Sequence, residues 1–490
     1  MFHKRNKDAS IGTGLTSGTQ SVESKPNISE SGSRRPGKGI GNGRDRDWTE
    51  GNILKNLVSL SWPMTVTQTI MSLGPTIDMI WVGKLGSTAV AGVGISGIIV
   101  QLAQGVMMGF TVGMRAMIAR AIGSQDIHAA NRIAQQAVII TAIYGIFMAI
   151  FGFFFGEKVI GLVTSDLEVI EYGTLYLRIQ FIAGGTVVFR MMMDAIMQAS
   201  GDSVNPMWIA IVYRLFHIAL CPFLIFGWWV FPELGVEGAA YTSIIAQTLG
   251  IILGLRVLIG SRSRVSITFK EFTFDTGIII RMIRIGLPSA ISNVQQNLNQ
   301  FFLQIFIAPF GGAAIAAHAI MQRLNMFIFM PTSSFGMGAG VLVGQNLGAG
   351  KPERAEKSAW IAVWLVTAFS VCIAVLFYFL AEPVIRIFNS EPDMVEMGIL
   401  FIQIGVVSWL FMGFASVLMN CLQGAGDTIP TMVLAIVTTW AITMPLAYFL
   451  PKYTDWGIAS IRWAISASSV IGALANIIYF RMGKWKTRRV

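Results

Sequence analysis

Apolar stretches of about twenty residues alternate with short polar breaks from residue 57 to residue 480. A stretch of this length crosses a bilayer as an α-helix, because a hydrocarbon core about 30 Å thick needs about 20 residues at a rise of about 1.5 Å each. The pattern therefore predicts an all-α polytopic membrane protein with twelve transmembrane helices. The predicted spans are 57–82, 89–116, 134–155, 172–197, 207–231, 239–260, 285–308, 314–343, 359–380, 398–422, 432–450 and 459–480.

The composition excludes a water-soluble enzyme. Hydrophobic residues make up 54% of the 490 residues and charged residues 13%, about half the share of roughly 25% that soluble domains carry. No P-loop, HExxH or GxSxG pattern occurs in the sequence, so ATP hydrolysis and membrane proteolysis lack the residues that perform them. We expect no enzyme activity, no metal, no organic cofactor and no nucleic acid partner, with energy drawn from an ion gradient.

Polar segments flank and divide the apolar region. Residues 1–50 lack a long apolar run and are rich in Ser, Gly, Lys and Arg, a composition that cannot bury a core. We predict a disordered basic cytoplasmic tail at 1–50, an N-lobe at 51–260, a cytoplasmic linker at 261–284, a C-lobe at 285–483 and a basic cytoplasmic C-terminus at 484–490. The basic tail suits contact with anionic membrane lipid.

Lysine and arginine are distributed unevenly between the two predicted sides of the membrane. With both termini in the cytoplasm, most of the 36 Lys and Arg residues fall on the cytoplasmic side. The other side receives Lys84, Lys158, Arg386, Lys452 and Arg462. Because cytoplasmic loops retain Lys and Arg, this distribution predicts a multi-pass protein of the plasma (cell inner) membrane with both termini cytoplasmic.

The two halves of the chain repeat each other at a spacing of 225 residues. Pro63 pairs with Pro288, Gly113 with Gly338, and Gly123 with Gly348, without a gap. Each half holds six predicted spans, an even number, so both halves enter the membrane from the same side. The repeat predicts two six-helix lobes related by pseudo-twofold symmetry about an axis along the membrane normal, an arrangement that secondary transporters use.

The seventh predicted span carries a stripe of neutral amides. Asn293, Gln296, Asn297, Gln300 and Gln304 recur at steps of three and four residues, which places them along one face of a helix. Lipid does not tolerate such a face. Hydrogen bonding within a tight bundle is one interpretation, and a water-filled cavity is the interpretation that we favour.

Isolated ionisable residues inside the spans are the candidates for ion coupling. Asp78, near the end of the first span, can bind a proton or Na⁺ and thereby favour one conformation of its helix. The alternatives are a structural ion pair, for example with Arg178, or an interfacial carboxylate near the outer end of the span. His217 lies near the middle of the fifth span, where it is either a titrating group or a satisfied core residue. Asp194 and Arg190, four residues apart, predict a structural salt bridge.

Two prolines occupy equivalent places in the first and seventh spans. Pro63 and Pro288 each leave a helix carbonyl without its partner, and we predict that the helices bend there. Methionine is abundant, with 26 residues, and its flexible thioether suits surfaces that repack around different ligands. We assign Met326 to such a surface, although core filling explains most of the others.

Several strings resemble the multidrug and toxic compound extrusion (MATE) family. The most specific is VGQNLGAGKPERAE at Val343 to Glu356, and IARAIGSQDIHAA at Ile118 to Ala130 is its weaker partner in the first half. IDMIWVGKLG, QASGDS, LGVEGAA and LQGAGDT also match. The resemblance covers about residues 55–483.

The resemblance implies two six-helix lobes around a central cleft. It also implies a monomer that exchanges a cation for drug-like small organic compounds, often cationic or amphipathic, by alternating access. On this basis we assign the substrate cavity to Gln68, Tyr176, Asn293, Gln296, Asn297, Gln300, Gln304 and Met326.

Within the family, the chain looks most like the DinF-like branch, which implies a cation or proton site in the first lobe at Asp78. The branch commonly shows Asn and then Asp-Pro in the fifth helix, where this chain has His217 and then Cys221-Pro222. Na⁺ prefers oxygen ligands, as other hard cations do. A coupling site of Asp78, His217 and Cys221 therefore favours H⁺ over Na⁺. The seventh helix lacks the Glu of the NorM-like branch, which argues against a cation site in the second lobe.

Two other functions stay open at this point. One is a lipid-linked oligosaccharide flippase of the same superfamily, which would be expected to show a more basic central cavity. Only four arginines within spans could supply that charge: Arg178, Arg190, Arg214 and Arg323. The other is a membrane receptor or scaffold that performs no transport.

Overall fold

The computed structural model describes residues 46–490 except 83–86, 163, 165, 183, 230, 261–262, 268–271, 389–390 and 489. These residues belong to one compact unit, 42–490. The predicted tail up to residue 45, and Lys84 on the predicted outer side, lie outside the described residues. No strand occurs in the part of the chain that the structure describes, so the all-α prediction is confirmed.

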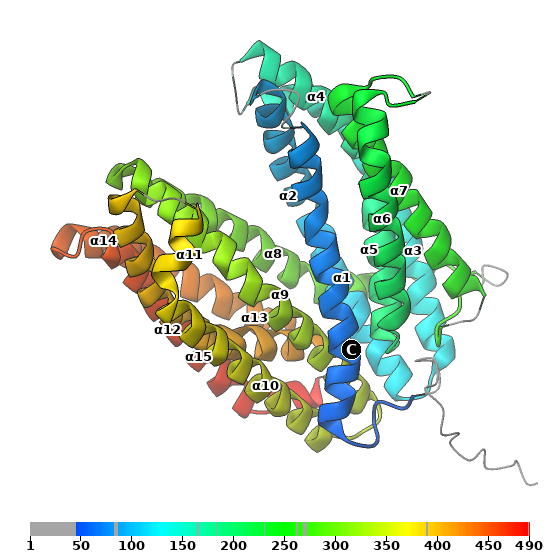
Figure 1. The fold of residues 1–490 in the computed structure, drawn as a ribbon. Helices are drawn as coiled ribbons and strands as arrows, with labels where there is room; N and C mark the ends of the chain where they lie inside the picture. The colour runs from blue at the N-terminus through cyan, green and yellow to red at the C-terminus, as the bar shows by residue number, and fades with distance from the viewer. Residues whose placement is uncertain are drawn as a thin grey trace, which may run out of the picture. The chain divides into compact units, whose positions relative to one another are not determined.

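Most of each predicted span is helical (Figure 1), although the helix of the predicted span 207–231 ends at Phe226. The helices of the first half are α1 (Ile53–Val82), α2 (Ser87–Gly123), α3 (Ile127–Gly161), α4 (Leu167–Ile182), α5 (Gly184–Ala199), α6 (Val204–Phe226) and α7 (Gly235–Ile259). Those of the second half are α8 (Thr276–Ile307), η2 (Ala308–Phe310), α9 (Gly312–Gly348), α10 (Pro352–Phe379), α11 (Ala381–Phe388), α12 (Pro392–Gly424), α13 (Thr428–Ile436), the π-helix η3 (Val437–Thr443), α14 (Met444–Tyr453), α15 (Ala459–Arg481) and η4 (Lys484–Thr487).

Ten of the described helical segments are long and apolar enough to cross a membrane, and α4 with α5 adds a broken eleventh span. The eleventh predicted span comprises α13, η3 and α14 together. The first span is α1, whose 30 residues are long enough but include Thr65, Thr67 and Gln68 among the apolar ones. Several helices start before the predicted spans because polar caps extend them. Asp126 accepts a hydrogen bond from the backbone N–H of Ala129 at the start of α3, and Asp275 does the same for Ile278 at the start of α8.

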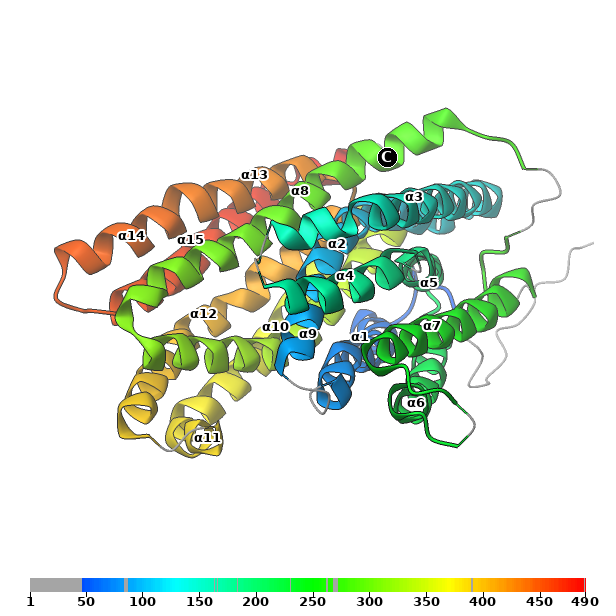
Figure 2. The ribbon, with the colours of Figure 1, turned by 90° about the horizontal axis from the view of Figure 1, so that it is seen from above.

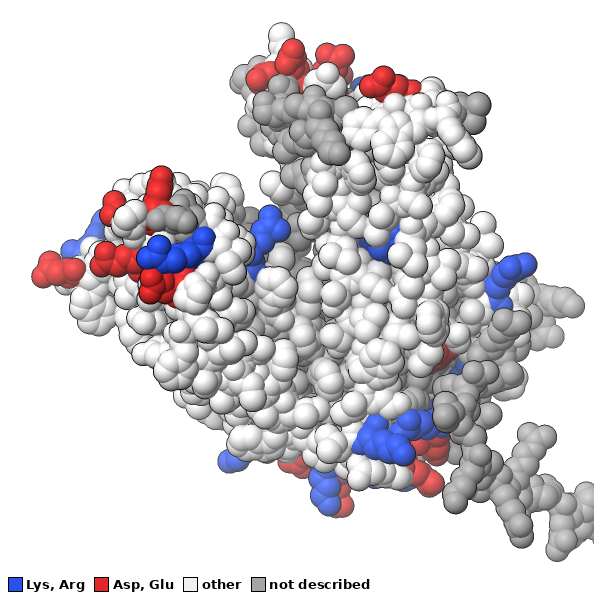
Figure 3. All heavy atoms as spheres, in the orientation of Figure 1, with Lys and Arg blue, Asp and Glu red and all other residues white. Residues whose placement is uncertain are grey.

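Charged side chains gather at the two ends of the helices and leave an apolar belt between them (Figure 3). One end holds residues 46–52, 124–132, 263–267, 272–281, 349–357 and 482–488. We call it the basic end because these segments and the adjoining helix ends, with Lys55, Arg120, Arg256, Arg284 and Arg481, carry most of the described Lys and Arg. The opposite end carries many acidic residues, including Glu157, Glu168, Glu382 and Asp393. This belt is the surface that a membrane-spanning bundle presents to lipid.

The helices form two bundles, α1–α7 and α8–α15, which we call the N-lobe and the C-lobe (Figures 1 and 2). Their packing is reciprocal. A Cβ atom on Gly123 would overlap the carbonyl oxygen of Gln345, and a Cβ atom on Gly348 would overlap that of Arg120. Both pairs map onto each other at the 225-residue spacing. The pseudo-twofold prediction is therefore visible in the contacts that hold the lobes together.

A second reciprocal pair lies deeper in the junction. Gly113 on α2 approaches the backbone of Gly286 on α8, and Gly338 on α9 approaches Ser61 on α1. Ser61 and Gly286 are again 225 residues apart. Close approach of helix backbones requires small residues at these positions, so the repeated glycines serve the same role in each lobe.

Both described ends of the chain pack against the basic end. Trp48, which the sequence analysis assigned to the tail, is 3% exposed and lies against Gly201 at the turn between α5 and α6. Trp485 is fully buried and stacks on Phe480 at 4.6 Å between ring centroids. Residues 276–284 of the predicted linker are helical and begin α8.

Candidate functional site

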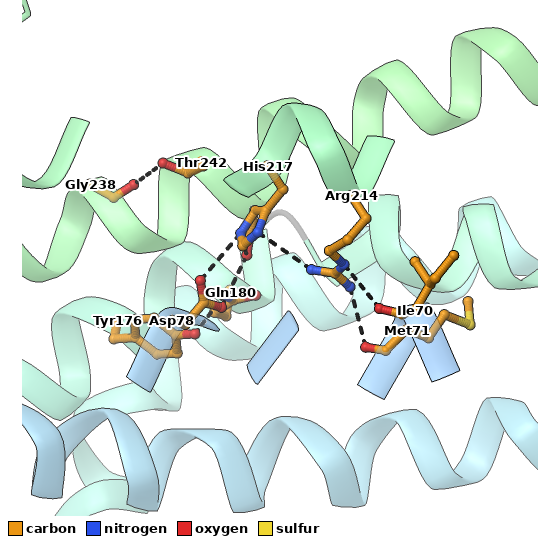
Figure 4. Close-up of polar contacts among 10 residues, drawn as sticks. Ile70, Met71, Asp78, Tyr176, Gln180, Arg214, His217, Gly238 and Thr242 are labelled. Atoms are coloured by element: carbon orange, nitrogen blue, oxygen red, sulfur yellow. Dashed lines mark hydrogen bonds and ion pairs between the residues drawn. The ribbon is translucent and has the colours of Figure 1, made fainter. Parts of the chain in front are cut away.

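Three helices of the N-lobe bring polar side chains together around Asp78 (Figure 4). Asp78 on α1 is 6% exposed, and its Oδ1 lies 3.2 Å from Nε2 of His217 on α6. Ser243 on α7 lies 3.4 Å from Asp78 Oδ2 and 3.3 Å from His217 Nε2. The structure thus places Asp78 beside His217, two members of the coupling site expected from the sequence, and adds the Ser243 hydroxyl, which was not expected.

Arg214 connects this cluster to the backbone of α1. Its Nη1 lies 3.4 Å from His217 Nδ1, while Nε donates to the carbonyl of Ile70 at 3.1 Å and Nη2 to that of Met71 at 3.2 Å. A proline at position 75 has no N–H, so the Met71 carbonyl lacks its usual partner four residues later in the helix. The guanidinium supplies the missing hydrogen bond. Figure 4 shows Arg214 between His217 and the two carbonyls.

Cys221 and Tyr176 complete the surroundings of Asp78. Cys221, one turn after His217 on α6, is fully buried. Its Sγ lies within 4.8 Å of a carboxylate oxygen of Asp78 and of a ring nitrogen of His217. Tyr176 on α4 is 7% exposed and accepts a hydrogen bond from Gln180 at 3.1 Å. A carboxylate, an imidazole and a thiol can hold a metal ion in general, but the Arg214 guanidinium beside the imidazole opposes a further fixed positive charge here.

The amide stripe of α8 continues the face by which α8 packs on α2. Near the basic end, a Cβ atom on Gly286 would lie 2.8 Å from the carbonyl oxygen of Gly109 on α2, and Gly109 also abuts Ala290. Asn293 and Gln300 follow Gly286 by seven and fourteen residues, and Asn297 and Gln304 follow Ala290 by the same steps. Residues seven apart share a helix face. The stripe therefore faces the N-lobe at a level where that packing has ended.

Exposure agrees with this placement. Gln296, Gln300 and Gln304 are exposed, and Asn293 and Asn297 are half-buried. Figure 3 shows the surface hollowed between the two lobes at the end opposite the basic end. Gln68 on α1 is half-buried and occupies the position equivalent to Asn293 at the 225-residue spacing. The two pseudo-equivalent helices thus direct amides toward the space between the lobes.

Other predicted residues lie apart from the Asp78 cluster. Met326 on α9 is 56% exposed. Pro63 and Pro288 are buried within the continuous helices α1 and α8. Arg190 forms an ion pair with Asp194, as expected, and also donates to Gln247 at 2.6 Å.

Arg178 pairs with Glu157 at 3.4 Å near the end opposite the basic end, so the alternative of an Asp78–Arg178 ion pair is wrong. The sequence analysis did not connect Arg214 or Ser243 with Asp78. The three-residue spacing of Arg214 and His217 on one helix was the available signal for Arg214, whereas Ser243 gave none.

The family model described as MatE matches residues 63–223 and again residues 288–449. This chain belongs to the MATE family. The two matches start 225 residues apart, so the internal repeat is confirmed. Members of this family are transporters, which supports the expectation that the chain is not an enzyme.

Curated relatives and solved structures agree with this assignment. The probable multidrug resistance protein YoeA of Bacillus subtilis (strain 168) is 24% identical over 433 residues, which cover 87% of this chain and 93% of the relative. The probable multidrug resistance protein NorM of Thermotoga maritima is 25% identical over 450 residues, 89% of this chain and 94% of the relative. A crystal structure of a MATE protein in a bent conformation superposes with a TM-score of 0.84 at 23% identity, covering 89% of this chain and 96% of that one.

These similarities settle the architecture and the broad class. The protein is a multi-pass membrane protein with the two-lobe, twelve-helix fold of MATE transporters. Its relatives carry names that refer to multidrug resistance.

Proposed function

We propose that this protein is a secondary active exporter that exchanges H⁺ for small organic, often cationic or amphipathic compounds by alternating access. The observation that carries the proposal is the buried cluster of Asp78, His217 and Ser243 at the junction of α1, α6 and α7. In a MATE family transporter without ATP-binding motifs, such a cluster is the group whose charge state an ion gradient can change.

The composition of the cluster favours a proton over Na⁺. Asp78 is the carboxylate of the cluster, and its neighbours are an imidazole, a hydroxyl and a thiol. Na⁺ needs several oxygen ligands, as other hard cations do, whereas a proton needs one basic atom. The Arg214 guanidinium, 3.4 Å from His217, further disfavours a bound metal cation.

Arg214 links the charge state of the cluster to the conformation of α1. Neutral His217 accepts from Arg214 through Nδ1. When the cluster takes up a proton and His217 carries hydrogen on both ring nitrogens, Nδ1 no longer accepts and the two cations repel each other. Arg214 then releases the carbonyls of Ile70 and Met71, and α1 is free to bend near position 75. Substrate bound beside α1 is expelled as the helix repacks.

The charge distribution supports an orientation for this cycle. The basic end faces the cytoplasm under the positive-inside rule, so both chain termini are cytoplasmic and the hollow between the lobes opens outward. Efflux also requires a second conformation, in which the lobes are separated at the basic end instead.

Transport by purified protein in proteoliposomes tests the proposal. A fluorescent organic cation is loaded, and an imposed proton gradient is compared with an imposed Na⁺ gradient for wild type, Asp78→Asn and the control Asp455→Asn, which neutralises an exposed carboxylate in the loop before α15. We expect proton-driven movement in wild type and the control and its loss in Asp78→Asn. Unchanged proton-driven transport in Asp78→Asn contradicts the coupling role.

A gain-of-function variant tests the choice of ion. Cys221→Asp places a second carboxylate beside Asp78, and Cys221→Ser is the uncharged control. We expect a Na⁺ gradient to drive transport in Cys221→Asp alone, because two carboxylates supply the oxygen ligands that the wild-type cluster lacks. Na⁺-driven transport already present in wild type overturns the proton assignment. Movement of a lipid-linked sugar in place of the dye, with no response to either gradient, supports the flippase alternative.

A further inference from the structure

The C-lobe also contains a buried cationic side chain, Arg462 on α15. The sequence analysis counted it with the outer loops, yet it is 4% exposed and packs its guanidinium over the Phe401 ring of α12 at 4.2 Å. Its Nη2 lies 2.9 Å from Nδ1 of His318 on α9. Buried Nε has no hydrogen-bond partner. Within the described residues, no Asp or Glu forms an ion pair with Arg462.

Arg462 differs in its partners from three other arginines inside the lobes, although Arg115 on α2 also has a buried Nε without a hydrogen-bond partner. Arg190 is paired with Asp194, Arg178 with Glu157, and Arg214 bonds to two carbonyls of α1. Burial of a guanidinium costs desolvation free energy. Without a carboxylate, contacts with an imidazole and an aromatic face offset only part of that cost. Such an arrangement stabilises the fold poorly, and an uncompensated charge within a membrane protein is expected where it meets a ligand.

A chain of polar side chains leads from Arg462 to the space between the lobes. His318 Nε2 lies 3.5 Å from the amide of Gln322, one turn further along α9. Gln322 bonds to Gln300, a member of the exposed stripe of α8, and accepts from Asn325 at 3.2 Å. Asn325 is held in turn by the indole N–H of Trp409 at 2.6 Å. The buried cation is thus separated from the amide stripe by two side chains, both of them polar.

We infer that Arg462 and His318 form an anion subsite of the C-lobe, which takes a carboxylate carried by an amphipathic substrate. This inference rests on the proposed function and adds to its substrate class amphipathic compounds that carry an acidic group. The guanidinium presents two parallel N–H donors that match a carboxylate. The Phe401 ring under the guanidinium and the apolar side chains around it make the surroundings of this position apolar.

The pseudo-equivalent region of the N-lobe has the opposite charge. Asp78 lies four residues from the end of α1, and Arg462 lies three residues from the start of α15, so both lie about one helical turn from the end opposite the basic end. A substrate carboxylate bound at Arg462 is therefore remote in sequence and lobe from the Asp78 cluster, which takes up the proton in the proposed function. The substrate carboxylate and the proton therefore do not compete for the same side chain.

Binding of a matched dye pair to the full chain in lipid nanodiscs tests the subsite. Rhodamine B and its ethyl ester differ only in whether the carboxyl group is free. We expect wild type to bind the free acid at least tenfold more tightly than the ester, because a charge-assisted bidentate pair contributes about that factor or more. In Arg462→Gln the ratio of the two affinities falls to within about twofold. Arg178→Gln, which removes an exposed cation paired with Glu157, keeps the wild-type ratio.

Two further measurements keep the test independent of folding and of transport. Arg462→Lys keeps the charge but not the planar fork, and we expect an intermediate ratio. The midpoint of thermal unfolding of Arg462→Gln should be equal to or above that of wild type, because the variant removes an unpaired buried charge. Equal affinity of wild type for both dyes overturns the subsite. So does a large fall in the unfolding midpoint of Arg462→Gln together with an equal loss of affinity for both dyes. Binding needs no gradient, so a failure of proton-driven transport with the acid preference intact refutes only the coupling proposal.

Discussion

At the scale of single residues, Gly74 and Arg214 decide how the Asp78 cluster contacts α1. A Cβ atom on Gly74 would overlap the Arg214 guanidinium, so only glycine lets that group reach the carbonyls of Ile70 and Met71. Those contacts place the guanidinium between a titratable ring and a helix segment weakened by proline. In the proposed mechanism, coupling therefore depends on a residue without a side chain as well as on charged ones.

Gly74→Ala is expected to displace Arg214 and to uncouple the cluster from α1. The added methyl forces a shift that costs about 1–3 kcal/mol, and proton-driven dye transport should fall severalfold while dye binding persists. Gly97→Ala is the control, since a Cβ atom there meets nothing within 4 Å. Proteoliposome transport and dye anisotropy measure the two properties. Wild-type transport in Gly74→Ala would show that Arg214 has no part in coupling.

At the scale of elements, α8 changes its role along its length. Its first half packs by Gly286 and Ala290 against α2, and its second half presents Asn293, Asn297 and Gln300 on the same face. A single helix thus serves as part of the lobe junction and as a wall of the space between the lobes. The change from small residues to amides along one face marks the level at which the lobes separate.

Cysteine labelling distinguishes water from lipid along α8. In a background without Cys221, Cys372 and Cys421, we expect Gln304→Cys to react with a charged, membrane-impermeant thiol reagent, because its face meets water. Ile305→Cys should not react, since Ile305 is 47% exposed on a face that presents apolar side chains to lipid. Equal reactivity of the two positions, or protection of both, contradicts the water-filled interpretation. Dye transport by each variant confirms that it has folded.

At the scale of the whole folded unit, segments at the basic end fasten the two lobes together. The string from Val343 to Glu356 and its partner from Ile118 to Ala130 supply the reciprocal contacts of Gly123 and Gly348. Both chain ends add to them: Lys351 donates to the Thr49 carbonyl at 3.3 Å, and Arg120 donates to the Arg488 carbonyl at 2.5 Å. The proposed alternating access would require that these contacts break together.

Gly123→Ala and Gly348→Ala are expected to have similar effects, because pseudo-twofold symmetry places each against the carbonyl of the other half. The added methyl cannot fit, so the population shifts toward lobes separated at the basic end. Spin labels at His128→Cys and Glu353→Cys, both exposed, should report longer distances by pulsed electron resonance. Gly105→Ala, where a Cβ atom meets nothing within 4 Å, is the control. An unchanged distance distribution in both variants would refute this account of the junction.

The sequence by itself determined the elements, the repeat and the family. Span length, the 225-residue spacing and the loop strings suffice because they depend on local hydrophobicity and on order along the chain. The amide stripe of α8 was also predictable, since periodicity places its members on one face. Asp78 and His217 were recognised as candidates because ionisable residues are rare inside spans.

Tertiary structure alone decided which of these residues meet. Arg214 joins Asp78 through His217 and the carbonyls of α1, and Arg462 is a buried partner of His318 although its position one turn from a helix end suggested an outer loop. Trp48 and Trp485 are buried although they lie in polar segments. The physical reason is common to all four. Which side chains face one another depends on how helices distant in sequence are rotated and packed, and hydrophobic pattern fixes the buried face of a helix without fixing its neighbour.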